Sequence, residues 1–192
     1  MSYIGFIANS ILFGVALAMD AFSVSVANGI NDPRMKRSRA FTIAGCFAFF
    51  QILMPLAGWF CVRKIATAFS VVQGYIPYIA FLLLLFIGVK MILEGQKNKD
   101  AESAAPAVGL YALLLQGIAT SMDALSVGFT ISDYNAVMAL AESLIIGAVT
   151  LVICLAGLLL GKRIGTRISG AASLLGGSIL IIIGIKILVS SL

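Results

Sequence analysis

Two similar apolar stretches of this chain each contain a single aspartate, and no other feature constrains the fold as strongly. The stretches are Gly14–Val26, which contains Asp20, and Gly117–Phe129, which contains Asp123 at the corresponding position; seven of their thirteen positions are identical. An ionised carboxylate at the centre of a membrane costs about 2.5–3.5 kcal/mol. A chain that accepts this cost at two corresponding places is expected to use the carboxylates. Asp20 and Asp123 are therefore the first candidates for an ion or proton pathway.

The composition indicates that lipid surrounds most of this chain. Hydrophobic residues make up 61% of it and charged residues only 11%, and the mean hydropathy is +1.10. A soluble domain of 192 residues has no interior large enough for so much apolar surface. The net charge of +5 does not indicate a nucleic-acid partner, because the basic residues lie between apolar runs. The chain has no histidine and no Cys-x-x-Cys sequence, which argues against a metal site with imidazole or thiolate ligands.

Six segments have the roughly 20 apolar residues that a transmembrane helix needs. The sequence therefore predicts an all-α polytopic membrane protein with six transmembrane helices. The predicted spans are residues 4–28, 41–62, 75–95, 107–131, 136–161 and 171–190.

Three landmarks recur in the same order and indicate an internal duplication. Besides the aspartate motif, Leu56–Gly58 matches Leu155–Gly157, and Gly88–Lys90 resembles Gly184–Lys186. Because three spans per half is an odd number, the second half must enter the membrane from the opposite side. Many secondary transporters have such inverted repeats, with the binding site at the repeat interface. A duplicated membrane scaffold without transport is the alternative. The predicted units are a first three-helix repeat (1–95), a cytoplasmic connector (96–106) and a second three-helix repeat (107–192).

Basic residues in the predicted loops indicate how the chain is oriented. The second and fourth loops carry only Arg63 and Lys64 between them. Since cytoplasmic loops are enriched in lysine and arginine, we expect the odd-numbered loops in the cytoplasm and both termini outside. The odd loops contain Arg34, Lys36, Arg37, Arg39, Lys97, Lys99, Lys162, Arg163 and Arg167.

Hydroxyl and amide side chains surround the two aspartates in the sequence. On a helix, residues three apart share a face, so Ser23 aligns with Asp20. Ser126 and Thr120 align with Asp123 in the same way. Together with carboxylates, such oxygens form a set suited to Mg²⁺, Mn²⁺ or Ca²⁺. Structural hydrogen bonding between helices is the alternative role for these aspartates.

Two amides are further candidates for the pathway. Gln51 lies deep in the second span, where it either completes a coordination sphere or bonds a neighbouring helix. Asn28, followed by Gly29, is expected to end the first helix. The neighbouring Met19 and Met122 point about 100° away from the aspartate face and are expected to pack rather than to bind metal.

Other charged residues near the spans are expected to lie at membrane surfaces. Lys90 and Lys186 lie close to span ends, where lysine extends to the interface; a gating role is the alternative for both. Glu94 is expected to pair with Lys90. Glu142 is assigned to an outer vestibule or to the rim. With these span ends, Asp20 and Asp123 are offset by about 12 Å along the membrane normal. One shared ion would then require tilted helices, broken helices or different span ends, and two sequential sites are the alternative.

The paired motifs resemble the signatures of the MntP-type manganese efflux pump family, which is distantly similar to lysine-exporter-type transporters. The resemblance rests on Met19–Ala21 with Ser23, and on Ser121–Ala124 with Val127 and Gly128. Phe50–Trp59 also resembles the family's second span, and the match covers essentially the whole chain. It implies export of Mn²⁺ across the cell (inner) membrane of a bacterium and a functional role for Asp20 and Asp123. Some relatives have an acidic residue where this chain has Gln51.

We therefore expect a secondary transporter that exports Mn²⁺ in exchange for protons, with lipids around it and no cofactor. Gly157–Lys162 is one residue short of a phosphate-binding loop, so ATP use is not expected. A transporter of another divalent metal or of a cationic amino acid is the alternative. An intramembrane aspartyl protease is disfavoured, because neither aspartate follows a Gly-x-Gly sequence. Neither the oligomeric state nor the metal selectivity is predicted.

Overall fold

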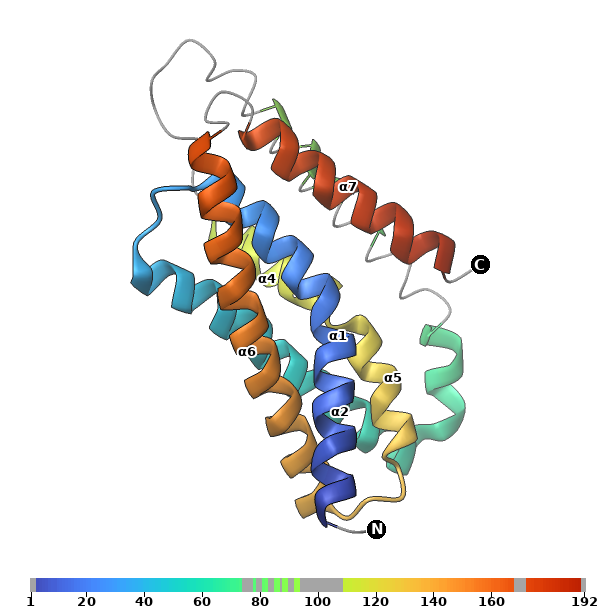
Figure 1. Cartoon of the computed structure of the whole chain (residues 1–192). Helices are drawn as coiled ribbons and strands as arrows, with labels where there is room; N and C mark the ends of the chain where they lie inside the picture. Colours follow the sequence, from blue (N-terminus) through green and yellow to red (C-terminus); the bar gives the residue numbers. More distant parts are fainter. Residues whose placement is uncertain are drawn as a thin grey trace.

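The computed structural model describes residues 3–73, 109–167 and 172–190, and between them residues 78, 81–82, 85–86, 88–89 and 92–93. This part of the chain is helical and contains no strand, so the predicted all-α class is confirmed. In lipid, only internally bonded backbones such as helices are stable. The helices are α1 (Tyr3–Asn31), α2 (Arg37–Gln73), α4 (Leu110–Thr120), α5 (Met122–Thr130), α6 (Ala136–Arg167) and α7 (Ala172–Ser190) (Figure 1).

Three helices of the described part are long and apolar enough to cross a membrane: Ile4–Asn31, Arg37–Cys61 and Ala136–Gly165. A fourth crossing results if α4 and α5 count as one broken span. The chain is thus built as a multi-pass membrane protein. The predicted sixth span coincides with α7, whereas most of the predicted third span (75–95) lies outside the described residues. The total of six spans stays a prediction.

The predicted fourth span (107–131) is broken rather than continuous. Helices α4 and α5 are separated at Ser121 and bent by 42°. The Ser121 hydroxyl donates to the backbone oxygen of Gly117 at 2.7 Å, and its N–H binds Ile118 instead of the residue four positions back. A serine that bonds backbone oxygens within its own helix favours such bends. The break lies two residues before Asp123.

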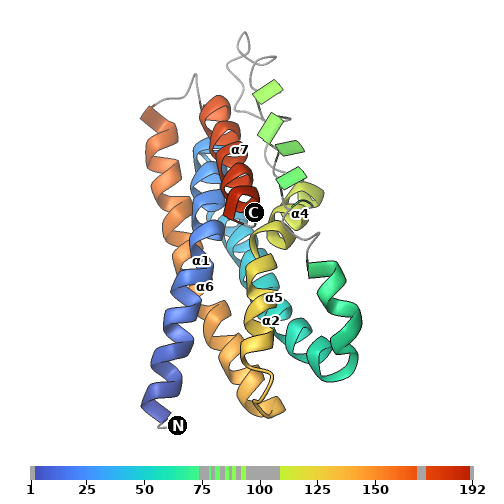
Figure 2. The same ribbon diagram turned by 90° about the vertical axis from the view of Figure 1, so that its right-hand side faces the viewer.

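Helices α1 and α6 lie side by side and run in the same direction (Figures 1 and 2). Their backbones approach most closely where glycines meet. A Cβ placed on Gly29 would lie 2.5 Å from the backbone oxygen of Leu158 and 3.0 Å from the Cα of Gly161. Small residues allow this approach between membrane helices. The prediction that α1 ends at Asn28 and Gly29 was therefore wrong: α1 continues to Asn31, because Gly29 serves helix packing and not a helix end.

Two helices extend beyond their predicted spans. Helix α2 runs from Arg37 to Gln73, and α6 continues to Arg167. Several basic residues assigned to loops are consequently helical, because lysine and arginine are good helix formers whose long side chains reach the polar interface. On the opposite flank of α1, α7 packs along it, as Figure 2 shows. This placement brings residues from the two ends of the sequence together.

Candidate functional site

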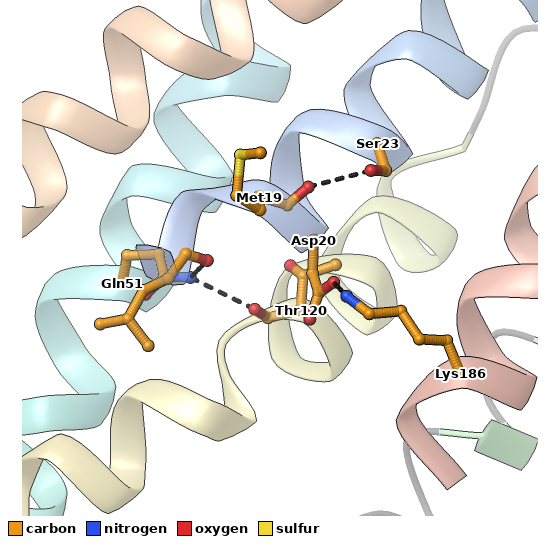
Figure 3. Close-up of polar contacts among 7 residues, drawn as sticks. Met19, Asp20, Ser23, Gln51, Thr120 and Lys186 are labelled. Carbon is orange, nitrogen blue, oxygen red and sulfur yellow. Dashed lines mark hydrogen bonds and ion pairs between the residues drawn. The ribbon is translucent and has the colours of Figure 1, made fainter. Parts of the chain in front are cut away.

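Asp20 lies in the middle part of α1 and forms an ion pair with a lysine of α7. The Lys186 ammonium donates to Oδ1 of Asp20 at 3.1 Å (Figure 3). The Asp20 side chain is 15% exposed and that of Lys186 is 64% exposed. The sequence did not predict this pairing, because Lys186 was expected to extend to the membrane surface. Because α7 packs on α1, the ammonium meets a carboxylate nearby, and the pair avoids the larger cost of an unpaired charge in this environment.

Asp123 belongs to the same charged cluster. It lies in the first turn of α5, directly after the break, and its side chain is exposed on the surface of the described part. The charges of both Asp20 and Lys186 act on it. An acidic residue in the first turn of a helix is also favoured by the helix dipole. The helix break thus lies directly before Asp123 and next to the region of Asp20 and Lys186, and the offset of the two aspartates along the membrane normal stays a prediction.

Gln51 of α2 links the segments that precede the two aspartates. Its fully buried side-chain nitrogen donates to the backbone oxygens of Leu17 and Thr120, each at 3.2 Å. Figure 3 shows the bond to Thr120 beside Asp20. Leu17 and Thr120 each lie three residues before an aspartate. The predicted helix–helix hydrogen bond is confirmed. The side-chain oxygen of Gln51 is buried without a hydrogen-bond partner in the described part of the chain.

The hydroxyl groups predicted near the aspartates mostly bond their own helices. Ser23 donates to the backbone oxygen of Met19 at 3.0 Å, and Thr120 donates to that of Gln116 at 2.9 Å. Ser126 is exposed on α5. The structure therefore brings Ser23 and Thr120 near the site without a hydrogen bond to either aspartate. Met19 is 55% exposed and points away from Asp20 in Figure 3, so it faces the surface instead of packing in the interior.

Asn28 takes part in a buried amide pair that the sequence did not predict. Its side-chain nitrogen donates to Gln116 at 2.8 Å, and the reverse bond measures 3.4 Å. Both side chains are fully buried, so the pair ties α1 to α4. Amide side chains in the apolar helices α1 and α4 were the available signal, but the sequence gives no indication that these helices face each other.

Glu142 of α6, predicted to lie in an outer vestibule or at the rim, is buried within the protein. Its side chain is 1% exposed, and Oε2 has no hydrogen-bond partner among the described residues. The charge of Glu142 acts on Tyr134, in the turn that precedes α6.

The described residues contain no group of three or more histidine, cysteine, aspartate or glutamate side chains that could hold a metal ion. A divalent cation bound between Asp20 and Asp123 would need further oxygen ligands. The free oxygen of Gln51 belongs to the same region and has the right chemistry.

These features define a multi-pass helical membrane protein with a charged polar site inside its apolar helices. Residues 34–188 match the family described as "Putative manganese efflux pump", and the chain belongs to this family. The family is one of transporters and not of enzymes.

Relatives with the same description come from bacteria and archaea. The protein of Clostridium perfringens (strain SM101) is 38% identical, over 95% of this chain and 93% of its own length. That of Methanobrevibacter smithii is 39% identical over 93% and 94%, and that of Methanosarcina acetivorans is 41% identical over 92% of both chains. No solved structure matches this chain.

Proposed function

We propose that this protein is a secondary transporter that exports Mn²⁺ from the cytoplasm, and that Asp20 and Asp123 bind the ion on its way. The observation that carries the proposal is that the buried Gln51 amide bonds the backbone of Leu17 and of Thr120, each three residues before a motif aspartate, and so joins the two aspartate segments, one from each half of the chain. Family membership supports the identity of the ion.

The proposed ion ligands are carboxylate and amide oxygens. The Asp20 and Asp123 carboxylates supply the charge, and the side-chain oxygen of Gln51 supplies a neutral ligand. Mn²⁺ accepts such hard oxygen ligands. Ser23, Ser126 and Thr120 line the approach to the carboxylates, and Asn28 supports it through its bond to Gln116.

We also propose that residues 1–95 and 107–192 form inverted repeats joined by a cytoplasmic connector. Equivalent glycines support this proposal, because they meet equivalent partners. The atom nearest to a Cβ on Gly58 is the backbone oxygen of Leu125, and for Gly157 it is that of Phe22. Gly58 and Gly157 end the two Leu-Ala-Gly landmarks, and Leu125 and Phe22 each follow a motif aspartate by two residues.

A second set of contacts repeats in the same way. The atom nearest to a Cβ on Gly14 belongs to Val149, and for Gly117 it belongs to Phe50. The two glycines each precede an aspartate by six residues, and Val149 and Phe50 each precede a landmark glycine by eight. Gln51 bonds the equivalent residues Leu17 and Thr120. Because the Gln51 amide bonds equivalent residues of both repeats, we place it close to the two-fold axis that would relate them. Transporters with inverted repeats bind their substrates near this axis.

Protons are the proposed counter-ion. Moving one Mn²⁺ outward against a negative-inside potential costs about 4.6 kcal/mol per 100 mV, twice the value for a single charge. Exchange for two protons would be electroneutral, and two neighbouring carboxylates are suited to it, because they can hold either the metal or the protons. The proposed location is the cell (inner) membrane. Both termini are proposed to lie outside, because the basic residues are concentrated in the odd-numbered loops, which then face the cytoplasm.

The proposal is tested in cells that lack their own manganese exporters and express the chain at equal membrane levels. After a Mn²⁺ challenge, we expect low intracellular manganese with the parent chain and high manganese with Asp20→Asn or Asp123→Asn. Asp133→Asn, which changes an exposed loop aspartate, is the matched control and should behave as the parent. A parent chain that leaves manganese unchanged would refute the metal assignment. Competition by other divalent metals or by cationic amino acids would then identify the substrate.

A further inference from the structure

The Lys186 ammonium occupies a position that a bound cation would need. It lies 3.1 Å from Oδ1 of Asp20, and its charge also acts on Asp123. Lys186 thus interacts with both carboxylates proposed to bind Mn²⁺, although it is separated from Asp20 by 166 positions in the sequence.

A divalent cation and this ammonium cannot share the Asp20 carboxylate at short range. Both are positive, and water screens little of their repulsion among apolar helices. The Lys186 side chain is 64% exposed, so it has room to swing away from Asp20. The Asp20 side chain is largely enclosed and stays in place.

We propose that Lys186 is a tethered counter-cation: it neutralises Asp20 when no ion is bound, and an incoming divalent cation must displace it. This inference rests on the proposed function. It gives Lys186 two effects on transport. Lys186 weakens ion binding, which aids release of the ion. When no ion is bound, it neutralises Asp20, so that no unpaired carboxylate lies inside the membrane.

A purely structural role is the competing explanation, since the ion pair also joins α7 to α1. The two roles predict opposite effects on affinity. If Lys186 only anchors α7, a neutral substitution leaves ion binding unchanged or weakens it. If Lys186 competes with the ion, the same substitution strengthens binding.

The first experiment measures Mn²⁺ binding to the detergent-purified chain, with free Mn²⁺ quantified by electron paramagnetic resonance. We expect Lys186→Gln to lower the Kd by about tenfold, equivalent to about 1.4 kcal/mol. Lys186→Arg, which keeps the charge, should stay close to the parent. So should Lys36→Gln, which removes an exposed charge near the start of α2. An equal or higher Kd for Lys186→Gln would overturn the proposal.

A second experiment uses the unsubstituted chain and so does not depend on the folding of a variant. Lys186 is labelled with an amine-acylating reagent, with and without saturating Mn²⁺, and the modified residues are quantified by mass spectrometry. A displaced ammonium reacts faster, so labelling of Lys186 should rise with Mn²⁺ while that of Lys36 stays constant. Unchanged or reduced labelling of Lys186 would overturn the proposal. A parent chain that binds no Mn²⁺ would instead refute the proposed function itself, and this inference with it.

Discussion

The side-chain nitrogen of Gln51 lies 3.2 Å from the backbone oxygen of Thr120, the last residue of α4. In an unbroken helix that oxygen would accept from the N–H of Ala124, but Ala124 bonds Ser121 instead. Gln51 therefore satisfies a carbonyl that the helix break leaves exposed. The amide both supports the break next to Asp123 and stands beside the proposed ion site.

Replacing Gln51 with leucine should destabilise the fold. The substitution removes the donor to both Leu17 and Thr120 and leaves two backbone oxygens without that partner. Unsatisfied buried groups of this kind cost about 1–3 kcal/mol each. We expect a clearly lower Tm for Gln51→Leu in detergent. Thr42→Val, which removes an exposed hydroxyl bonded only within its own helix, should change the Tm little. Equal Tm values for the two variants would contradict this account of Gln51.

The close contact between α1 and α6 should depend on Gly161 of α6, because the backbone of α1 lies directly against it. A Cβ on Gly161 would collide with the backbone oxygen of Val26 and lie 2.9 Å from the Cα of Gly29. Gly161→Ala should therefore separate the helices and lower the free energy of unfolding by about 2 kcal/mol or more. Gly45→Ala is the matched control, because nothing lies within 4 Å of its added Cβ. There, the higher helix propensity of alanine should stabilise the chain by up to about 1 kcal/mol. Chemical denaturation of both variants tests the difference.

The titration of Tyr134 should report on the buried Glu142. Burial, and next to it the negative charge of Glu142, raises the pKa of the Tyr134 phenol above its ordinary value. Glu142→Gln should lower this pKa, while leaving it raised because burial is the larger cause. The measurement is the ultraviolet difference titration of each chain against its own Tyr134→Phe variant. An unchanged Tyr134 titration would show that Glu142 carries no charge that acts on it.

The raised pKa of Tyr134 also predicts that the protein becomes less stable at high pH. Because the folded chain holds the phenolic proton more tightly than the unfolded chain, the free energy of unfolding should fall as the pH rises above about 10. Tyr134→Phe should reduce this fall. Thermal unfolding of the parent and of Tyr134→Phe across that pH range provides the check.

The sequence predicted the elements well where one physical requirement dominates. Long apolar runs must be helical in lipid, so the helical class and the positions of α1 and α6 followed directly. The two aspartates could be identified because charge is rare at such positions. Gln51 was noticed as a polar residue deep in a span, and the helix–helix hydrogen bond was one of the two roles predicted for it.

The sequence could not predict features that depend on which helices pack against each other. The pairing of Lys186 with Asp20 requires α7 to pack on α1, and the amide pair of Asn28 and Gln116 requires α4 to do so. The break at Ser121 depends on side-chain bonds within one turn, which a hydrophobicity pattern does not reveal. Gly29 looked like a helix end because its tight packing partner lies far away in the sequence.

The central claim is that Mn²⁺ crosses the membrane through Asp20 and Asp123 in exchange for protons. It is tested most directly in proteoliposomes that contain the purified chain, with an imposed pH gradient as the only driving force and Mn²⁺ flux as the readout. The account predicts Mn²⁺ movement against the proton flow with the parent chain and with Asp133→Asn, and background flux with Asp20→Asn and Asp123→Asn. Parental flux in either of the latter two variants would contradict the role of the aspartates. A parental Mn²⁺ flux that is the same with and without the pH gradient would contradict the exchange of Mn²⁺ for protons.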